Sequence, residues 1–148
     1  MINSYLNYIQ ENYKSNEITL GKFNKSYYNS LKDKNKIYFD EKAGKYFVIK
    51  YNNENCGIVG VIIRKPRYFF QIILEPKFRG KNFVEISANL IMDKFKLNKL
   101  YAAIINTNTA SLKAHKKSGF KRNLKKEKEL KNQKKLIDKQ ILLNKIRR

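Results

Sequence analysis

The feature that most constrains the fold is a strand, a helix and a second strand that follow one another directly. Tyr68–Leu74 is a mainly apolar run typical of a buried strand, and Pro76 ends it because proline lacks the N–H that a sheet ladder needs. Residues 83–96 then carry apolar side chains at helical spacing, and Leu100–Ile105 is the next apolar run. Because strands joined through a helix lie parallel in one sheet, this βαβ unit is predicted to be the centre of the fold.

Periodicity and turn residues predict further elements on both sides of this unit. They are a helix over Met1–Tyr13, a strand over Ile18–Phe23, a helix N-capped by Ser26, a hairpin of Tyr46–Tyr51 and Gly57–Ile63, a helix over Ala110–Ser118 that Gly119 terminates, and a last hairpin of Lys121–Leu130 and Lys135–Ile146.

The composition is that of one soluble domain. At 148 residues and 42% hydrophobic content, the chain is long enough to bury a core. The single cysteine, Cys56, excludes an internal disulfide and a Cys/His metal cluster, so no metal site is predicted. No apolar run approaches the roughly 20 residues of a membrane span. We expect a single domain over residues 1–148 that is cytoplasmic and does not enter membranes.

The formal net charge of +21 predicts attraction to anions such as CoA, nucleotide-linked sugars or RNA. The lysines are spread over almost every segment, however, whereas a binder of single-stranded nucleic acid alternates basic residues with stacking aromatics on one face. Nucleic acid is therefore a possible partner that the pattern does not favour.

A basic turn joins the first strand of the βαβ unit to its helix. Arg79-Gly80-Lys81-Asn82 stands at the helix N-terminus, where backbone N–H groups and the helix dipole favour an anion. Gly80 permits close approach of the backbone, and two cationic side chains add to the attraction. The turn is predicted to hold a phosphate, although a lone glycine here also serves ordinary loop geometry.

A second motif follows the second parallel strand and carries a family resemblance. Asn108–Phe120 reads Asn-Thr-Ala-Ser-Leu-Lys-Ala-His-Lys-Lys-Ser-Gly-Phe and resembles the Asn-x-x-Ser/Ala … Gly-Phe motif of GNAT acyltransferases. Pro76–Asn82 resembles their Arg/Gln-x-x-Gly-x-Gly/Ala pyrophosphate loop. The two motifs occur in the family's order, and the resemblance covers about Lys45 to Ile146.

The resemblance implies an α/β (α+β) fold with a mixed, mostly antiparallel sheet, a central parallel βαβ unit and splayed strands. In GNAT enzymes the strand matching Tyr68–Leu74 carries a bulge and splays from the strand matching Leu100–Ile105, and the pantetheine of acetyl-CoA lies in the gap. The residues implied to bind the donor are the main chain of Ile73 and Leu74, the N–H groups of Phe78, Arg79, Gly80, Lys81, Asn82, Phe83 and Val84, and Asn108 and Ser111.

The sequence departs from the family pattern at several places. Asn82 replaces the last Gly/Ala of the loop, and Val84 occupies a position that is small in many relatives. His115, the only histidine, stands where the family often has a general-acid tyrosine. Its ordinary pKa near ~6.5 suits an acid or a base, and a structural role is equally compatible with the pattern.

The general base is not evident. The positions of the glutamates that serve as base in different relatives are occupied by Tyr68 and Ala103. Glu75, at the end of the first splayed strand, is the nearest carboxylate by sequence and a candidate base. The alternatives are that Glu75 is a solvated strand end or pairs with a nearby lysine, and that ordered water or a partly neutral substrate amine replaces the base. Tyr68 and Tyr101 are candidates for lining the cleft, although strand aromatics are more often core.

The resemblance implies an N-acetyltransferase in which a primary amine attacks the thioester of acetyl-CoA directly. The positive charge favours amines attached to anions, and a small-molecule amine, an amino sugar and a protein or aminoacyl amine all remain open. The enzyme is expected to be a monomer or a homodimer. The alternative is a catalytically weak GNAT scaffold that docks on RNA or ribosomes through its basic surface.

Overall fold

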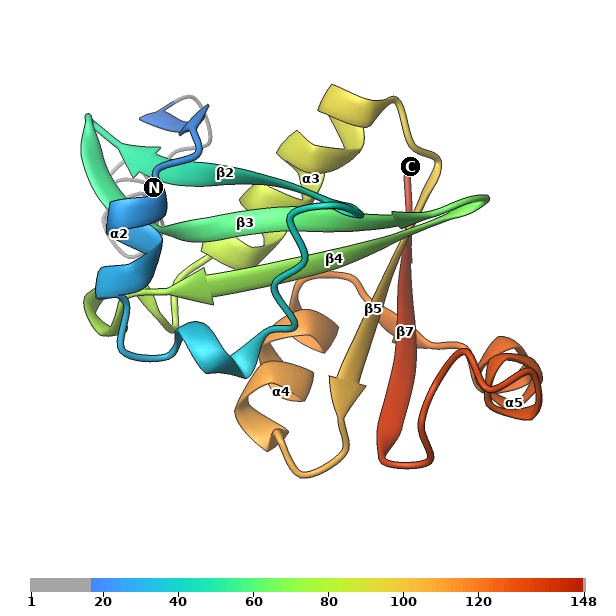
Figure 1. Ribbon diagram of the computed structural model, residues 1–148. Helices are drawn as coiled ribbons and strands as arrows, with labels where there is room; N and C mark the ends of the chain where they lie inside the picture. The colour runs from blue at the N-terminus through green and yellow to red at the C-terminus, as the bar shows by residue number, and fades with distance from the viewer. Residues whose placement is uncertain (1–16, 148) are drawn as a thin grey trace, which may run out of the picture.

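The computed structural model describes residues 17–147, whose strands form one seven-stranded sheet in the order β1-β2-β3-β4-β5-β7-β6 (Figure 1). The mixed, mostly antiparallel α/β fold that the sequence implied is confirmed, whereas the predicted helix over Met1–Tyr13 lies outside the described residues. The elements are β1 (Ile18–Lys22), α2 (Lys25–Ser30), the 3₁₀ turn η2 (Lys34–Lys36), β2 (Gly44–Tyr51), β3 (Glu54–Arg64), β4 (Arg67–Leu74), the 3₁₀ turn η3 (Pro76–Phe78), α3 (Phe83–Phe95), β5 (Lys99–Ile105), α4 (Thr109–Lys117), β6 (Lys121–Arg122), α5 (Leu124–Asn132) and β7 (Gln140–Ile146).

The four N-terminal strands form an antiparallel meander. The predicted hairpin of β2 and β3 turns at Asn52 and Asn53, whose positive φ values of 48° and 65° match the tight turns that suit hairpins. Between β3 and β4 the register is unbroken along β4, so the bulge implied for β4 is wrong. The irregularity lies instead between Ile49 and Lys50 of β2.

The two parallel strands touch at one point and then separate. β4 and β5 pair only at Phe69 and Tyr101, and Figure 1 shows the strands diverging from there toward their C-terminal ends. β4 stays hydrogen-bonded to β3, and β5 is paired along its length with β7. The splay between the strands is thereby confirmed.

Helices cover both faces of the sheet. The main core lies under α3 and includes Phe83 and Ile91, with Leu112 of α4 packed against it. Two smaller clusters fill the opposite face, one under α2 and one under α5 (Figure 1). Within residues 17–147, none of the helices has both the length and the apolar character that crossing a bilayer requires.

The segment before the hairpin is capped differently from the prediction. Asn24, and not Ser26, is the N-cap of α2, because its side-chain oxygen accepts a hydrogen bond of 2.9 Å from the N–H of Tyr27. This moves the start of the helix and turns the side chain of Tyr27 toward the end of β4, where it meets Glu75.

The predicted last hairpin is wrong in its first half. β6 comprises only Lys121 and Arg122, and the chain then forms α5. Asn123 caps this helix by accepting from the N–H of Lys126 at 3.0 Å, and the following leucine, lysine and glutamate residues are good helix formers. The run lacks the period-2 alternation of a strand, so propensity and a cap outweigh the expected hairpin.

A buried carboxylate holds α5 to the sheet. Glu127, with a side chain only 3% exposed, accepts two hydrogen bonds from Arg122, at 3.1 and 2.9 Å, and one from Lys131 at 3.2 Å. Its carboxylate also accepts a hydrogen bond of 2.9 Å from the backbone N–H of Leu142. This bond satisfies the edge of β7 beyond the point where β6 ends. These donors, Arg122 foremost, lower the pKa of Glu127 to about 2.

We predict that Glu127→Ala lowers the free energy of unfolding by about 2–3 kcal/mol, because it leaves a buried backbone N–H without its charged acceptor. Since the folded pKa is below the unfolded value of ~4.3, this contribution is complete above pH ~4.3 and lost as the pH falls toward 2. Urea unfolding at pH 7 and pH 3 measures both effects.

The matched control is Glu129→Gln on the same helix, which removes an exposed partner of Lys126 and should change stability little. Equal effects of the two substitutions would contradict this role of Glu127.

Candidate functional site

The open end of the gap between β4 and β5 is bordered by the turn that leads into α3. After Leu74 the chain forms η3, and Phe78 anchors it by packing edge-on against Phe83, with ring centroids 5.3 Å apart. The N–H of Phe78 donates to the carbonyl of Glu75 at 3.0 Å, and the N–H of Arg79 donates to that of Pro76 at 3.2 Å. Two of the N–H groups predicted to hold a phosphate are therefore engaged inside the turn.

Gly80 supplies the backbone geometry of this turn. Its φ of 75° is left-handed, and a Cβ added there would meet no heavy atom within 4 Å. Asn82 has a φ of −95°, so its position does not need glycine. The first intrahelical bond of α3 runs from the N–H of Ile86 to the carbonyl of Asn82, so the positive end of the helix dipole lies at this turn.

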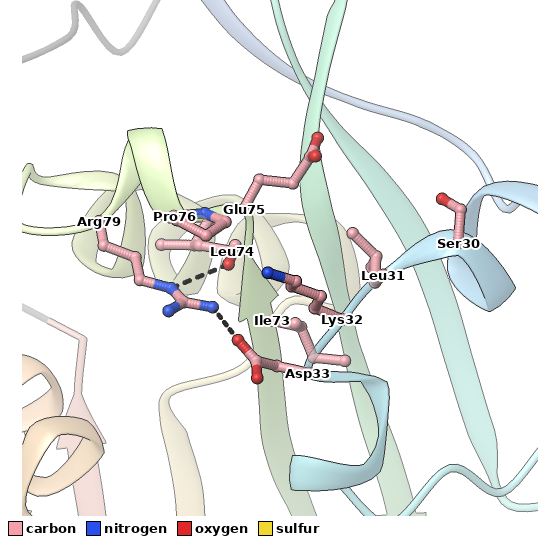
Figure 2. Close-up of a pocket in the computed structure, with 9 residues that line it drawn as sticks. All are labelled: Ser30, Leu31, Lys32, Asp33, Ile73, Leu74, Glu75, Pro76 and Arg79. Carbon is pink, nitrogen blue, oxygen red and sulfur yellow. Dashed lines mark hydrogen bonds and ion pairs between the residues drawn. The ribbon is translucent and has the colours of Figure 1, made fainter.

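Arg79 folds back over the end of β4. Its Nε donates to the carbonyl of Leu74 at 3.0 Å, and its Nη2 forms an ion pair with Asp33, at the junction of α2 and η2 (Figure 2). The two segments enclose a pocket beside β4. It is lined by Ser30, Leu31, Lys32, Asp33, Ile73, Leu74, Glu75, Pro76 and Arg79.

Glu75 is held on the α2 side of the sheet. Its carboxylate accepts a hydrogen bond of 2.7 Å from the hydroxyl of Tyr27, and its N–H donates to the carbonyl of Cys56 at 2.9 Å. Burial, and then the hydrogen bond to Glu75, raise the pKa of Tyr27 well above its usual value, so the phenol stays protonated as the donor. In Figure 2 the carboxylate points away from Asp33 and Arg79.

The second motif forms the start and end of α4. Asn108 is the N-cap and accepts from the N–H of Ser111 at 3.2 Å. At the other end Gly119 has a φ of 96° one residue beyond the C-cap, as predicted, and Lys145 donates to the carbonyl of Ser118 at 2.6 Å. Asn108 and Ser111 thus stand together where β5 enters α4.

His115 is buried, with 4% of its surface exposed, on the α3 and α4 side of the sheet. Its ring packs against Phe70 of β4 and against Phe120, at centroid distances of 5.8 and 5.1 Å. Nδ1 lies 2.8 Å from the carbonyl oxygen of Ser111. The Ser111 hydroxyl lies 3.3 Å from the same nitrogen. Because a carbonyl only accepts and is the nearer partner, this geometry favours the neutral tautomer with its proton on Nδ1 and a lone pair on Nε2. Burial lowers its pKa, with the Ser111 carbonyl opposing the shift.

The two cleft tyrosines are not brought together. Tyr68 packs against Phe95 of α3, with centroids 6.0 Å apart, and belongs to the main core. Tyr101 packs against Phe69, at 5.7 Å, in the cluster under α5 on the opposite face. Sequence analysis did not predict the pocket residues between α2 and η2, among them Asp33, because no residue spacing within residues 18–37 indicates a site.

A family model supports the resemblance over most of the chain. Residues 9–120 match the model described as the acetyltransferase (GNAT) family. The parted parallel strands and the glycine turn are the two features that the resemblance to this class of acyltransferases implied. The chain is a member of the GNAT acetyltransferase family. A search of curated protein sequences finds no match.

Solved GNAT structures share the fold. A chimera of the spermidine N-acetyltransferase SpeG from Vibrio cholerae with hSSAT has a TM-score of 0.61 at 17% identity, over 88% of this chain and 95% of that one. The Vibrio cholerae spermidine N-acetyltransferase in complex with CoA and spermine has a TM-score of 0.56 at 19% identity, over 73% and 83%. The microcin C7 self-immunity acetyltransferase MccE in complex with acetyl-CoA and AMP has a TM-score of 0.53 at 16% identity, over 72% and 62%.

We predict that His115, the only imidazole in the chain, titrates below its ordinary pKa of ~6.5 and is the Nδ1–H tautomer at neutral pH. Its ¹⁵N chemical shifts, followed in untagged protein as the pH is lowered, measure both properties. A pKa at or above 6.5, or a proton on Nε2, would contradict this placement of the ring.

Proposed function

We propose that this chain is an acetyl-CoA-dependent N-acetyltransferase that acts on a primary amine as a single domain. The observation that carries the proposal is the single β4–β5 pairing, after which the strands part toward Gly80 and the N-terminus of α3. Family membership and neighbours crystallised with CoA or acetyl-CoA support the same donor.

The donor would enter the gap through its pantetheine arm. Main-chain groups of Ile73 and Leu74 remain the proposed partners of the pantetheine amides. The N–H groups of Phe78 and Arg79 donate to carbonyls within the turn, so a pyrophosphate held by the proposed cradle of residues 78–84 would have to share or displace those two bonds. Asn108 and Ser111, at the start of α4, would contact the arm from the other side of the gap.

The reaction forms one C–N bond and breaks one C–S bond. A neutral amine attacks the thioester carbonyl carbon, the nitrogen gives up a proton, and the departing CoA sulfur takes one up. His115, neutral with a lone pair on Nε2, suits the acceptance of that proton and its return to sulfur, whereas it does not suit the role of a resting general acid. Glu75 stays the candidate for removing the first proton from the ammonium.

The acceptor that charge favours is an amine attached to an anionic group. A net charge of +21 repels polyamines at a distance and attracts anionic amines. The spermidine acetyltransferases share the fold with this chain at identities too low to carry over their acceptor.

We predict that saturating acetyl-CoA stabilises the protein, by about 2.7 kcal/mol at ~100 times its dissociation constant, and that thiol release requires an added amine. Thermal unfolding and a thiol-release assay over a matched panel test this. The panel contains spermidine, a neutral amine and an amine bearing a phosphate or carboxylate, and the anionic amine should give the highest kcat/KM.

Stabilisation with spermidine as the best acceptor would overturn the proposed acceptor class alone. Absence of both stabilisation and turnover would overturn the enzyme, and salt-sensitive RNA binding alongside that result would favour the docking module instead.

A further inference from the structure

Arg79 has a partner inside the protein that a bound donor would have to displace. Its guanidinium is paired with the carboxylate of Asp33 and donates to the carbonyl of Leu74 (Figure 2). Arg79 heads the turn proposed to hold the pyrophosphate, and Leu74 is one of the residues proposed to pair with pantetheine. The pair with Asp33 therefore engages the cationic side chain of the turn that is proposed to hold the pyrophosphate.

The position and partial burial of Asp33 favour its ion pair with Arg79. It lies where α2 passes into η2, 46 residues before Arg79 in the chain, and its side chain is only 25% exposed. Lys36 lies 3.6 Å away and adds a second, longer ion pair. The hydrogen bond from Arg79 is the main cause that lowers the pKa of Asp33, so the carboxylate is anionic at neutral pH.

A pyrophosphate offers Arg79 a partner with more negative charge and more acceptor oxygens than one carboxylate, and it binds a guanidinium in the same two parallel charge-assisted hydrogen bonds. While the pair with Asp33 persists, the charge of Arg79 is neutralised and its side chain lies over the end of β4. Binding of the donor then has a cost, which is the separation of this pair.

We propose that Asp33 sets the donor affinity of the site by competing with the pyrophosphate of acetyl-CoA for Arg79. This inference rests on the proposed function. Since the pair also joins both walls of the pocket beside β4, arrival of the donor releases the α2–η2 wall. Donor binding and separation of the Asp33–Arg79 pair are coupled, so whatever stabilises the pair weakens donor binding by the same factor.

The test compares Asp33→Asn with Glu54→Gln. Glu54 is paired with Lys77 of η3, so its substitution removes the same charge beside the same turn without touching Arg79. Dissociation constants are measured calorimetrically for acetyl-CoA and for S-acetylpantetheine, which has the same arm and thioester without the pyrophosphate. Thermal unfolding shows that each variant is folded.

Asp33→Asn should tighten acetyl-CoA binding by about two- to fivefold, the scale of one partly exposed ion pair, and leave S-acetylpantetheine unchanged. Glu54→Gln should change either constant by less than about twofold. In an Arg79→Ala background, Asp33→Asn should change the dissociation constant of acetyl-CoA no more than Glu54→Gln does, because the guanidinium for which Asp33 and the pyrophosphate compete is absent.

Equal effects of the two single substitutions, weaker acetyl-CoA binding by Asp33→Asn, or an equal shift for S-acetylpantetheine would overturn the competition and make Asp33 a structural residue. Failure of the unsubstituted protein to bind acetyl-CoA is a different result, which removes the proposed function and this inference with it.

Discussion

The arrangement of the molecule depends on one pair of residues, Phe69 and Tyr101, at which two parallel strands meet before they separate. Each strand keeps a full ladder on its other side, β4 with β3 and β5 with β7, so the sheet parts without leaving either strand unsupported. The ends of both strands lead into helices, and backbone N–H groups gather at the helix N-termini. The proposed donor site is made mainly from backbone, and the fold itself is shared with solved structures at identities below 20%.

Carboxylates hold distant segments of this strongly basic chain together. It has 12 acidic residues against 33 lysines and arginines, and six of the carboxylates within residues 17–147 form ion pairs. Glu127 uses three donors to fix α5 where β6 stops, and Asp33 ties the α2–η2 segment to the glycine turn. Both have pKa values lowered chiefly by an arginine. Glu75 is held by a neutral tyrosine instead, which leaves its charge uncompensated by that contact.

Local signals predicted much of the fold, and contacts between distant segments account for what they missed. Apolar periodicity and turn residues located the βαβ unit, and Gly119 ended α4 as expected. The α5 helix was missed although Asn123 caps it, because Lys121–Leu130 was predicted to be the first strand of a hairpin with Lys135–Ile146. At the site, Gly80 could be found from its turn, but the pairing of Asp33 with Arg79 spans 46 residues and has no local signature. The tautomer of His115 likewise depends on the neighbouring Ser111 carbonyl.

The gap between β4 and β5 is where we propose that the acyl donor binds. Hydrogen–deuterium exchange with and without saturating acetyl-CoA tests this proposal most directly, because it reports where bound donor protects the backbone. Bound donor should slow exchange over residues 73–84 and 108–115, which border the gap, and leave α5 unchanged. Protection confined to α5 and the other basic surfaces, with residues 73–84 unaffected, would contradict the proposal.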